Sequence, residues 1–198
     1  HHMQLERRDE WLALLTRAAG LENDLMRRQA LLLAAQRLDE AAASLRQGSL
    51  RMMFEGGVYT VVRLAEQFPP EFARTSADVQ DVAGYAKWRL WRNAEADQHL
   101  QAAEALHRAR GDESAARLAA LRRAAMLAGI GRPDAARRAM PAGDRDADPV
   151  EARIHARVCD TWIALEEGSS CAVAPRFEAL LDALEQAGQP ELWATMVP

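Results

Sequence analysis

The densest group of side chains that could bind a ligand lies between Tyr85 and Arg92. In a helix, Tyr85, Trp88 and Arg92 would share one face, because they are three and four residues apart. An aromatic ring beside a guanidinium can stack on a sugar or another planar ligand while the guanidinium pairs with a carboxylate or a phosphate. We therefore predict a ligand-binding site formed by Tyr85, Trp88, Arg89 and Arg92. The alternative is that Trp88 and Trp91 fill the space between repeats and that the arginines are solvated.

A second candidate for ligand contact is Trp162, which follows Arg153, His155 and Arg157. We expect these residues in the first helix of a helix pair, the position that residues 76–92 occupy two pairs earlier. Trp162 is predicted either to contact the ligand or to pack between neighbouring repeats.

The other reactive residue types form no catalytic or metal-binding pattern. His155 and Cys159 are four residues apart, which suits two ligands of a zinc ion, but a zinc site needs three or four ligands. No serine stands in a nucleophile-elbow sequence. Gly56-Gly57 is not followed by the Lys-Ser/Thr pair of a phosphate-binding loop. We predict no catalytic residue, no metal site and no cofactor, and we expect that the chain is not an enzyme.

Turn signals recur along the chain at nearly constant spacing. Gly56-Gly57, Asn93, Gly131 and Gly168 each separate two helical stretches, in steps of 37, 38 and 37 residues. A period of about 20–50 residues is typical of stacked repeats, and the repeat here is a helix pair. The predicted fold is all-α, an α-solenoid of stacked antiparallel helix pairs with about ten helices.

Helix start and stop signals give the expected boundaries. Gly20 is predicted to end the first helix in a left-handed conformation, Pro69-Pro70 to interrupt the chain, and Thr75 or Ser76 to cap the next helix. The expected helices are 4–19, a stretch from 24 to about 55 with an internal boundary left open, 58–67, 76–92, 94–110, 113–129, 133–140, 150–167 and 172–187. Residues 191–198 are interpreted as the start of a helix without a partner, which predicts self-association.

Composition limits the classes of partner. The 198 residues carry a net charge of −4, with mixed charges along the helices, which argues against direct nucleic-acid binding. No stretch approaches the ~18 consecutive apolar residues that span a bilayer, so we expect no membrane partner and a cytoplasmic location. Residues 1–3 are interpreted as a purification-tag remnant, and residues 4–198 as one domain. His99 and His107 are expected at the surface, and Cys159 and Cys171 as buried thiols.

Three segments carry a resemblance to a known family. The passage Arg51–Glu71 contains a helix, a glycine pair, a helix and an apolar-Pro-acid sequence. It resembles the corresponding passage of the large ATP-dependent LuxR-type transcriptional activators, the class of the maltose-regulon activator. Leu100–Leu106 and Gly131–Ala136 are similar to second helices of the tetratricopeptide-like pairs in that family. The resemblance covers roughly residues 40–188.

This resemblance implies a tetratricopeptide-like superhelix that senses an inducer. It implies a fragment of a larger regulator, because the sequence contains neither the Walker-type ATPase nor the helix-turn-helix of a complete activator. The expected function is ligand sensing and signal relay, with a small-molecule inducer or a peptide partner bound on the concave face. The alternative is a protein-interaction scaffold or chaperone of tetratricopeptide type.

Overall fold

The computed structural model describes residues 2–143, 148–168 and 170–195, and the chain is all-α, as predicted. Helices make up 82% of the structure, and the described residues contain no strand. The elements in chain order are α1 (His2–Leu21), α2 (Leu25–Ala34), α3 (Leu38–Phe54), α4 (Val58–Ala65), α5 (Pro70–Thr75), α6 (Ala77–Arg89), α7 (Asn93–Ala109), α8 (Glu113–Gly129), α9 (Pro133–Ala139), α10 (Val150–Glu166), α11 (Ser170–Ala187) and the 3-10 helix η1 (Pro190–Thr195).

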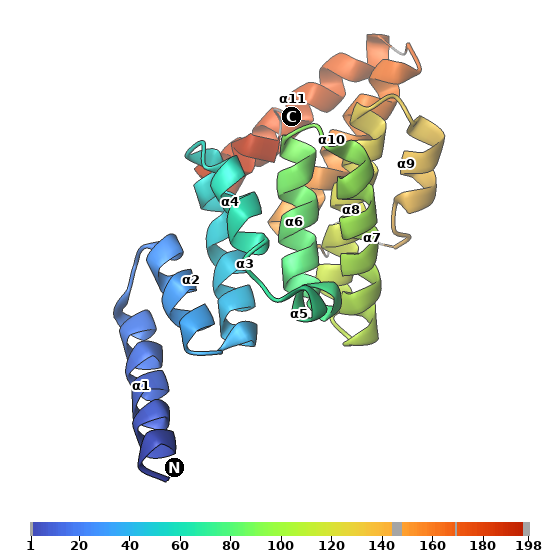
Figure 1. Cartoon of the computed structure of the whole chain (residues 1–198). Helices are drawn as coiled ribbons and strands as arrows, with labels where there is room; N and C mark the ends of the chain where they lie inside the picture. The colour runs from blue at the N-terminus through green and yellow to red at the C-terminus, as the bar shows by residue number, and fades with distance from the viewer. Residues whose placement is uncertain (1, 144–147, 169, 196–198) are drawn as a thin grey trace.

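The helices form a stack of pairs. α3, α6, α8 and α10 begin at residues 38, 77, 113 and 150, so they are spaced by 39, 36 and 37 residues. We call these four the first helices; each is followed by a partner, namely α4, α7, α9 or α11. Consecutive first helices pack on one another, and α7 also packs on α8 (Figure 1). This arrangement confirms the predicted solenoid.

Local signals explain the central elements. The Ser76 hydroxyl accepts a hydrogen bond from the Val79 amide at the start of α6, and the Asp112 carboxylate accepts one from the Ala115 amide at the start of α8. α8 packs against α7, α9 and α10. Its buried alanines keep these helices close, because small side chains fit between backbones that approach from several sides.

Two helix boundaries in the N-terminal part differ from the expected ones. α1 continues through Gly20, which is not left-handed, and ends at Leu21. The open boundary between residues 24 and 55 lies before α3, where Gln36 has a φ of 59°. Asparagine, aspartate and glycine are the residues that most often adopt this conformation, so glutamine gave no turn signal here.

The end of α6 also differs from the expected one. The expected helix 76–92 stops at Arg89, and the turn that was predicted at Asn93 is made by Trp91, which has a left-handed φ of 60°. Asn93 instead begins α7. The two prolines interrupt the chain as predicted, but Pro70 also starts the short helix α5, because proline suits the first turn of a helix.

The C-terminal segment is not the unpartnered helix that we expected. α11 runs back across the molecule, and η1 packs against α3 and α10 (Figure 1). Leu192 in η1 is completely buried. Met196 and Val197 lie outside the described residues. The prediction of self-association therefore cannot rest on this segment.

Gly84 lets α6 and α7 approach closely. A Cβ atom at this position would lie 2.8 Å from Leu100 Cγ and 3.0 Å from the Leu100 backbone nitrogen. Alanine normally stabilises a helix interior by about 0.5–1 kcal/mol relative to glycine, but here the added methyl group meets backbone. We expect Gly84→Ala to lower the free energy of unfolding by about 1–3 kcal/mol, measured by urea denaturation.

Gly20→Ala is the matched control for this prediction. Gly20 lies inside α1, and a Cβ atom there would meet nothing within 4 Å. This variant is expected to match or exceed the wild-type stability. If Gly84→Ala also did so, the close approach of α6 and α7 would be contradicted.

Candidate functional site

The two predicted aromatic site residues of α6 lie in the core. Tyr85 is 1% exposed and Trp88 is 3% exposed, and their rings contact each other with centroids 5.7 Å apart. Both rings also contact the imidazole of His155 on α10. Neither ring therefore presents a face to solvent, and the structure brings them together as packing between repeats.

The two predicted arginines differ in burial, and the charge of Arg89 interacts with Tyr85. Arg92 is exposed and precedes α7 without a side-chain capping bond. Arg89 is partly buried, and its Nε and one terminal nitrogen have no hydrogen-bond partner among the described residues. Burial lowers the pKa of Arg89. The neighbouring Trp91 is 58% exposed.

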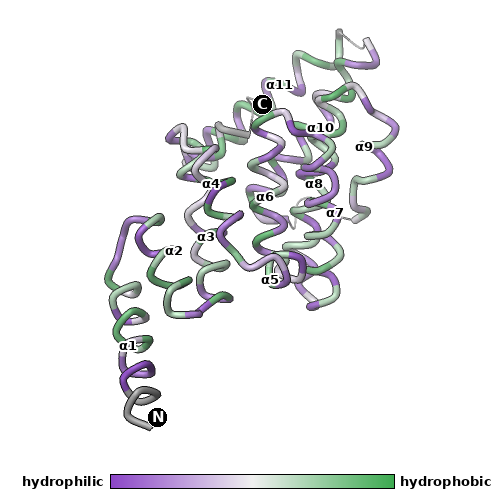
Figure 2. The backbone as a smooth tube through the Cα atoms, in the orientation of Figure 1, coloured by the Kyte–Doolittle hydropathy of each residue, from purple (hydrophilic) through white to green (hydrophobic). Residues whose placement is uncertain are grey.

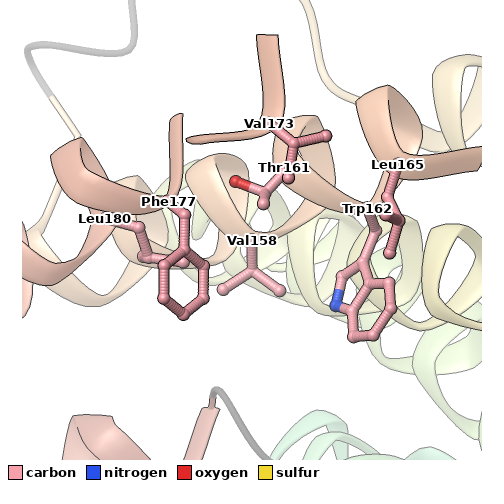
Figure 3. A pocket seen from close by; sticks show the side chains of 7 residues that line it. All are labelled: Val158, Thr161, Trp162, Leu165, Val173, Phe177 and Leu180. Atoms are coloured by element: carbon pink, nitrogen blue, oxygen red, sulfur yellow. The ribbon is translucent and has the colours of Figure 1, made fainter. Parts of the chain in front are cut away.

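Trp162 lies at a different place, in an apolar groove between α10 and α11 (Figure 3). The groove has a volume of about 230 Å³. It is lined by side chains of both helices: Val158, Thr161, Trp162, Leu165, Val173, Phe177 and Leu180. Trp162 thus shares no site with Tyr85 and Trp88, and we call this surface the α10–α11 groove.

A buried ionic centre connects three first helices. Arg122 of α8 donates to Asp81 of α6 at 2.6 Å and to Glu151 of α10 at 2.5 Å. Arg122 and Asp81 are 7% and 3% exposed. Each carboxylate belongs to a different helix pair from the arginine, so these ion pairs hold three successive pairs in register.

Aromatic rings surround this ionic centre. The Arg122 guanidinium lies over the Tyr85 ring, 4.6 Å from its centroid, which is a favourable cation–π geometry. His155 is fully buried, and its Nε2 lies 3.7 Å from Glu151 Oε1, beyond hydrogen-bond distance. The Tyr85 hydroxyl and both His155 nitrogens have no hydrogen-bond partner among the described residues.

Burial and charge set the protonation states of the ionic centre. Burial opposes the charge of Arg122, but Asp81 and Glu151 outweigh it and hold the pKa of Arg122 above its ordinary value. Burial likewise acts to raise the pKa of Glu151, whereas the charge of Arg122 holds it well below the usual range. Burial lowers the pKa of His155 and raises that of Tyr85. At neutral pH, Arg122 is therefore a cation and Glu151 a carboxylate, beside a neutral imidazole and a neutral phenol.

A polar cleft opens beside this centre and is lined by all four first helices. Its volume is about 410 Å³. Its walls carry three carboxylates and two guanidinium groups among apolar residues: Ala43, Arg46, Gln47, Ser49, Leu50, Asp78, Asp81, Val82, Leu118, Arg122 and Glu151. Arg46 pairs with Asp78 at 3.0 Å, while Asp81 Oδ1 has no hydrogen-bond partner among the described residues. We call this space the first-helix cleft.

Sequence reasoning did not find the residues of this centre and cleft. It considered His155 as a metal ligand and in the segment that precedes Trp162, and it did not consider Asp81, Arg122 or Glu151. One signal was present, because α8 is apolar on several faces and such a helix is buried on several sides. A charged residue in the middle of it, Arg122, must then be paired.

The histidines and cysteines also lie differently from the expectation. His107 is 2% exposed and is therefore not a surface residue, whereas His99 is only partly buried and contacts side chains of α6. Cys159 is buried as expected, but Cys171 is exposed. Among the described residues, no group of three or more His, Cys, Asp or Glu side chains could hold a metal ion.

His99 is part of a chain of polar contacts. Its Nδ1 lies 2.7 Å from Gln80 Oε1, its Nε2 lies 3.1 Å from Lys87 Nζ, and Gln80 Nε2 donates to the Ala73 carbonyl. Because the Gln80 oxygen accepts and the Lys87 ammonium donates, the neutral imidazole with its proton on Nδ1 fits both. Burial lowers the pKa of His99, and the charge of Lys87 lowers it further.

Acid is expected to destabilise the fold through its buried histidines. Burial lowers the pKa of His99, His107 and His155 in the folded state, whereas in the unfolded chain they titrate at about 6.5. Their contribution to stability is therefore complete above a pH of about 6.5 and is lost as the pH falls through the lower folded-state values. Urea denaturation between about pH 7.5 and pH 5 should show a decreasing free energy of unfolding.

The His99→Gln variant checks this assignment. It removes one of the groups that take up a proton on unfolding, so its stability should depend less steeply on pH than that of the wild type. A variant with an unchanged slope would contradict the role given to His99.

Comparison with known proteins identifies no family for this chain. No protein-family model matches the sequence, and neither the curated proteins nor the solved structures include a match. In the described part of the chain, no helix combines the length and the apolar character needed to cross a bilayer. The class that the fold defines is an all-α solenoid of helix pairs.

Proposed function

We propose that the chain is the ligand-sensing and signal-relay domain of a transcriptional regulator, and that its ligand binds in the first-helix cleft. The observation that carries the proposal is the composition of this cleft, to which four successive first helices contribute charged or polar side chains. The resemblance to LuxR-type activators supports the regulatory role. Tyr85 then supports Arg122 from behind the cleft, and neither Tyr85 nor Trp88 touches the ligand.

The lining of the cleft indicates a polar ligand. Carboxylates outnumber guanidinium groups by three to two, so the lining favours a ligand with several donor groups. Arg46 and Gln47 at the exposed side can donate to an acceptor group. A small molecule with several donors and at least one acceptor, such as a sugar or an amino acid, fits this pattern.

Ligand binding in this cleft would act on the shape of the stack. Each first helix belongs to a different pair, and in repeat proteins each unit contacts only its neighbours. A ligand that bridges several first helices stabilises one relative arrangement of the pairs over the others. This shift would be the signal that the domain transmits to an attached domain.

A thermal-shift screen against sugars, amino acids and nucleotides tests the proposal. A ligand class that binds the folded state raises the melting temperature in a concentration-dependent way. The Arg46→Ala, Gln47→Ala double variant should lose this shift, because both side chains line the cleft and their exposure keeps the cost in stability small. Absence of any shift across the library would contradict the proposal.

The alternative, a protein-interaction scaffold or chaperone, is favoured by a different observation. The α10–α11 groove is apolar and open, as a surface that binds a helix of another protein would be. If the scaffold were correct, small molecules would give no shift and an apolar helical peptide would stabilise the chain.

A further inference from the structure

The α10–α11 groove lies where the stack would place another first helix. The preceding pair, α8 and α9, is related to α10 and α11 by 37 residues, because α8 and α10 begin at 113 and 150 and α9 and α11 at 133 and 170. In the preceding pair, α10 packs on both α8 and α9. In the described part of the chain, the short helix η1 contacts both α10 and α11, but it has only six residues and none of them lines the groove.

Equivalent residues in the two pairs show the effect of this missing helix. Val158 (3% exposed), the partly buried Trp162 and Leu165 line the groove, and 37 residues earlier stand Leu121, Ala125 and Ala128, which are at most 1% exposed. Leu165, by contrast, is 51% exposed. On the partner helices, Val173 corresponds to the fully buried Ala136. The groove therefore has the form of a helix-binding surface whose helix is supplied from elsewhere.

At the other end of the stack, α1 has apolar side chains that no other described part of the chain covers. α1 packs on α2 through Ala19, assisted by Leu12 and Leu15. A second stripe, spaced three, four and three residues apart, lies on a different side of α1 and is exposed: Trp11, Leu14, Ala18 and Leu21. Figure 2 shows hydrophobic turns in the middle of α1, although this helix extends away from the body. A helix that is apolar on two sides is typically covered on both.

These two surfaces account for much of the exposed apolar area. Of the ten large hydrophobic side chains that are most exposed among the described residues, five lie on them: Trp11, Leu14, Leu21, Leu165 and Phe177. α1 lies at one end of the molecule, and α10 and α11, whose side chains form the groove, lie toward the other end (Figure 1), so one chain cannot bring the two surfaces together. A second copy of the chain can.

We propose that the chain self-associates head to tail, with the exposed stripe of α1 in one copy bound in the α10–α11 groove of the next. The occupant is a second copy because this chain carries both an uncovered amphipathic helix and a groove that lacks one. Such an interface is heterologous, so it produces rings or open chains of copies and not a simple symmetric dimer. The proposal does not depend on the ligand site.

Light scattering coupled to size-exclusion chromatography tests it with two surface variants. Leu14→Glu breaks the α1 stripe and Phe177→Glu breaks the groove, and both replaced side chains are half-exposed, so circular dichroism should show an unchanged fold. The wild type is expected to form species larger than a monomer, in proportions that rise with concentration. Each variant alone should be monomeric. Tyr59→Glu, on the exposed side of α4, is the control that should assemble like the wild type.

Mixing the two variants gives the sharpest result. Phe177→Glu retains an intact α1 and Leu14→Glu retains an intact groove, so an equimolar mixture should form a heterodimer that grows no further. A wild-type chain that stays monomeric up to about 1 mM would overturn the proposal. So would a mixture of the variants that stays monomeric, because a head-to-tail contact must restore one interface.

Discussion

The Arg122→Met variant is expected to lose about 3–5 kcal/mol of its free energy of unfolding, because it leaves two buried carboxylates without their cation. Arg122 donates to both Asp81 and Glu151, and no other cation is recorded in hydrogen-bond contact with either carboxylate among the described residues. Methionine keeps most of the volume of the arginine side chain. The decrease in the free energy of unfolding therefore reports the loss of the positive charge and not the creation of a cavity. Urea denaturation at neutral pH gives the value.

Two further variants separate charge from packing in this result. In the triple variant Asp81→Asn, Arg122→Met, Glu151→Gln, all three charges are absent, so stability should recover relative to Arg122→Met alone. Arg123→Ala removes a neighbouring arginine whose pair with Asp97 is partly exposed, and should cost at most about 1 kcal/mol. A loss below about 1 kcal/mol for Arg122→Met would contradict the ionic centre.

The second large effect is expected at Trp88. The Trp88→Ala variant should lose about 3–5 kcal/mol, because it removes a buried indole that packs against both Tyr85 and His155. Arg92→Ala should change stability by no more than about 0.5 kcal/mol, because Arg92 is exposed and caps nothing. Thermal and urea denaturation of the two single variants check both values.

The same two variants also show whether Trp88 and Arg92 contribute to the core or contact a ligand. If Trp88→Ala kept the wild-type stability and abolished binding of a ligand, the buried position of Trp88 would be wrong and the aromatic-arginine prediction would be right. The expected result is the reverse, with a lower stability for Trp88→Ala and unchanged ligand binding for Arg92→Ala.

The sequence predicted the fold well where local signals coincide. α8 was predicted at its observed bounds, because Asp112 caps its start and Gly131 stands just after its end with a φ of 72°. The prediction failed where a residue with little preference for the left-handed conformation makes the turn, as at Gln36 and Trp91. Such turns depend on how the flanking helices pack, which a local pattern does not contain.

The candidate site was harder to predict than the fold. Spacing within one helix correctly placed Tyr85 and Trp88 near each other, but it could not tell which side of α6 is covered. α6 contacts α3, α4, α7 and α8, so nearly every side of it is buried. The ionic centre joins residues 29 and 41 positions apart, and only the packing of successive pairs brings them together.

The most direct test of the proposed function is a calorimetric titration of the stabilising ligand from the screen. It compares the wild type with the cleft variant Arg46→Ala, Gln47→Ala and with the groove variant Phe177→Glu. We expect the cleft variant to bind at least about tenfold more weakly, a loss of about 1.4 kcal/mol, and the groove variant to bind like the wild type. Unchanged affinity in the cleft variant, or lost affinity in the groove variant, would contradict a ligand site between the first helices.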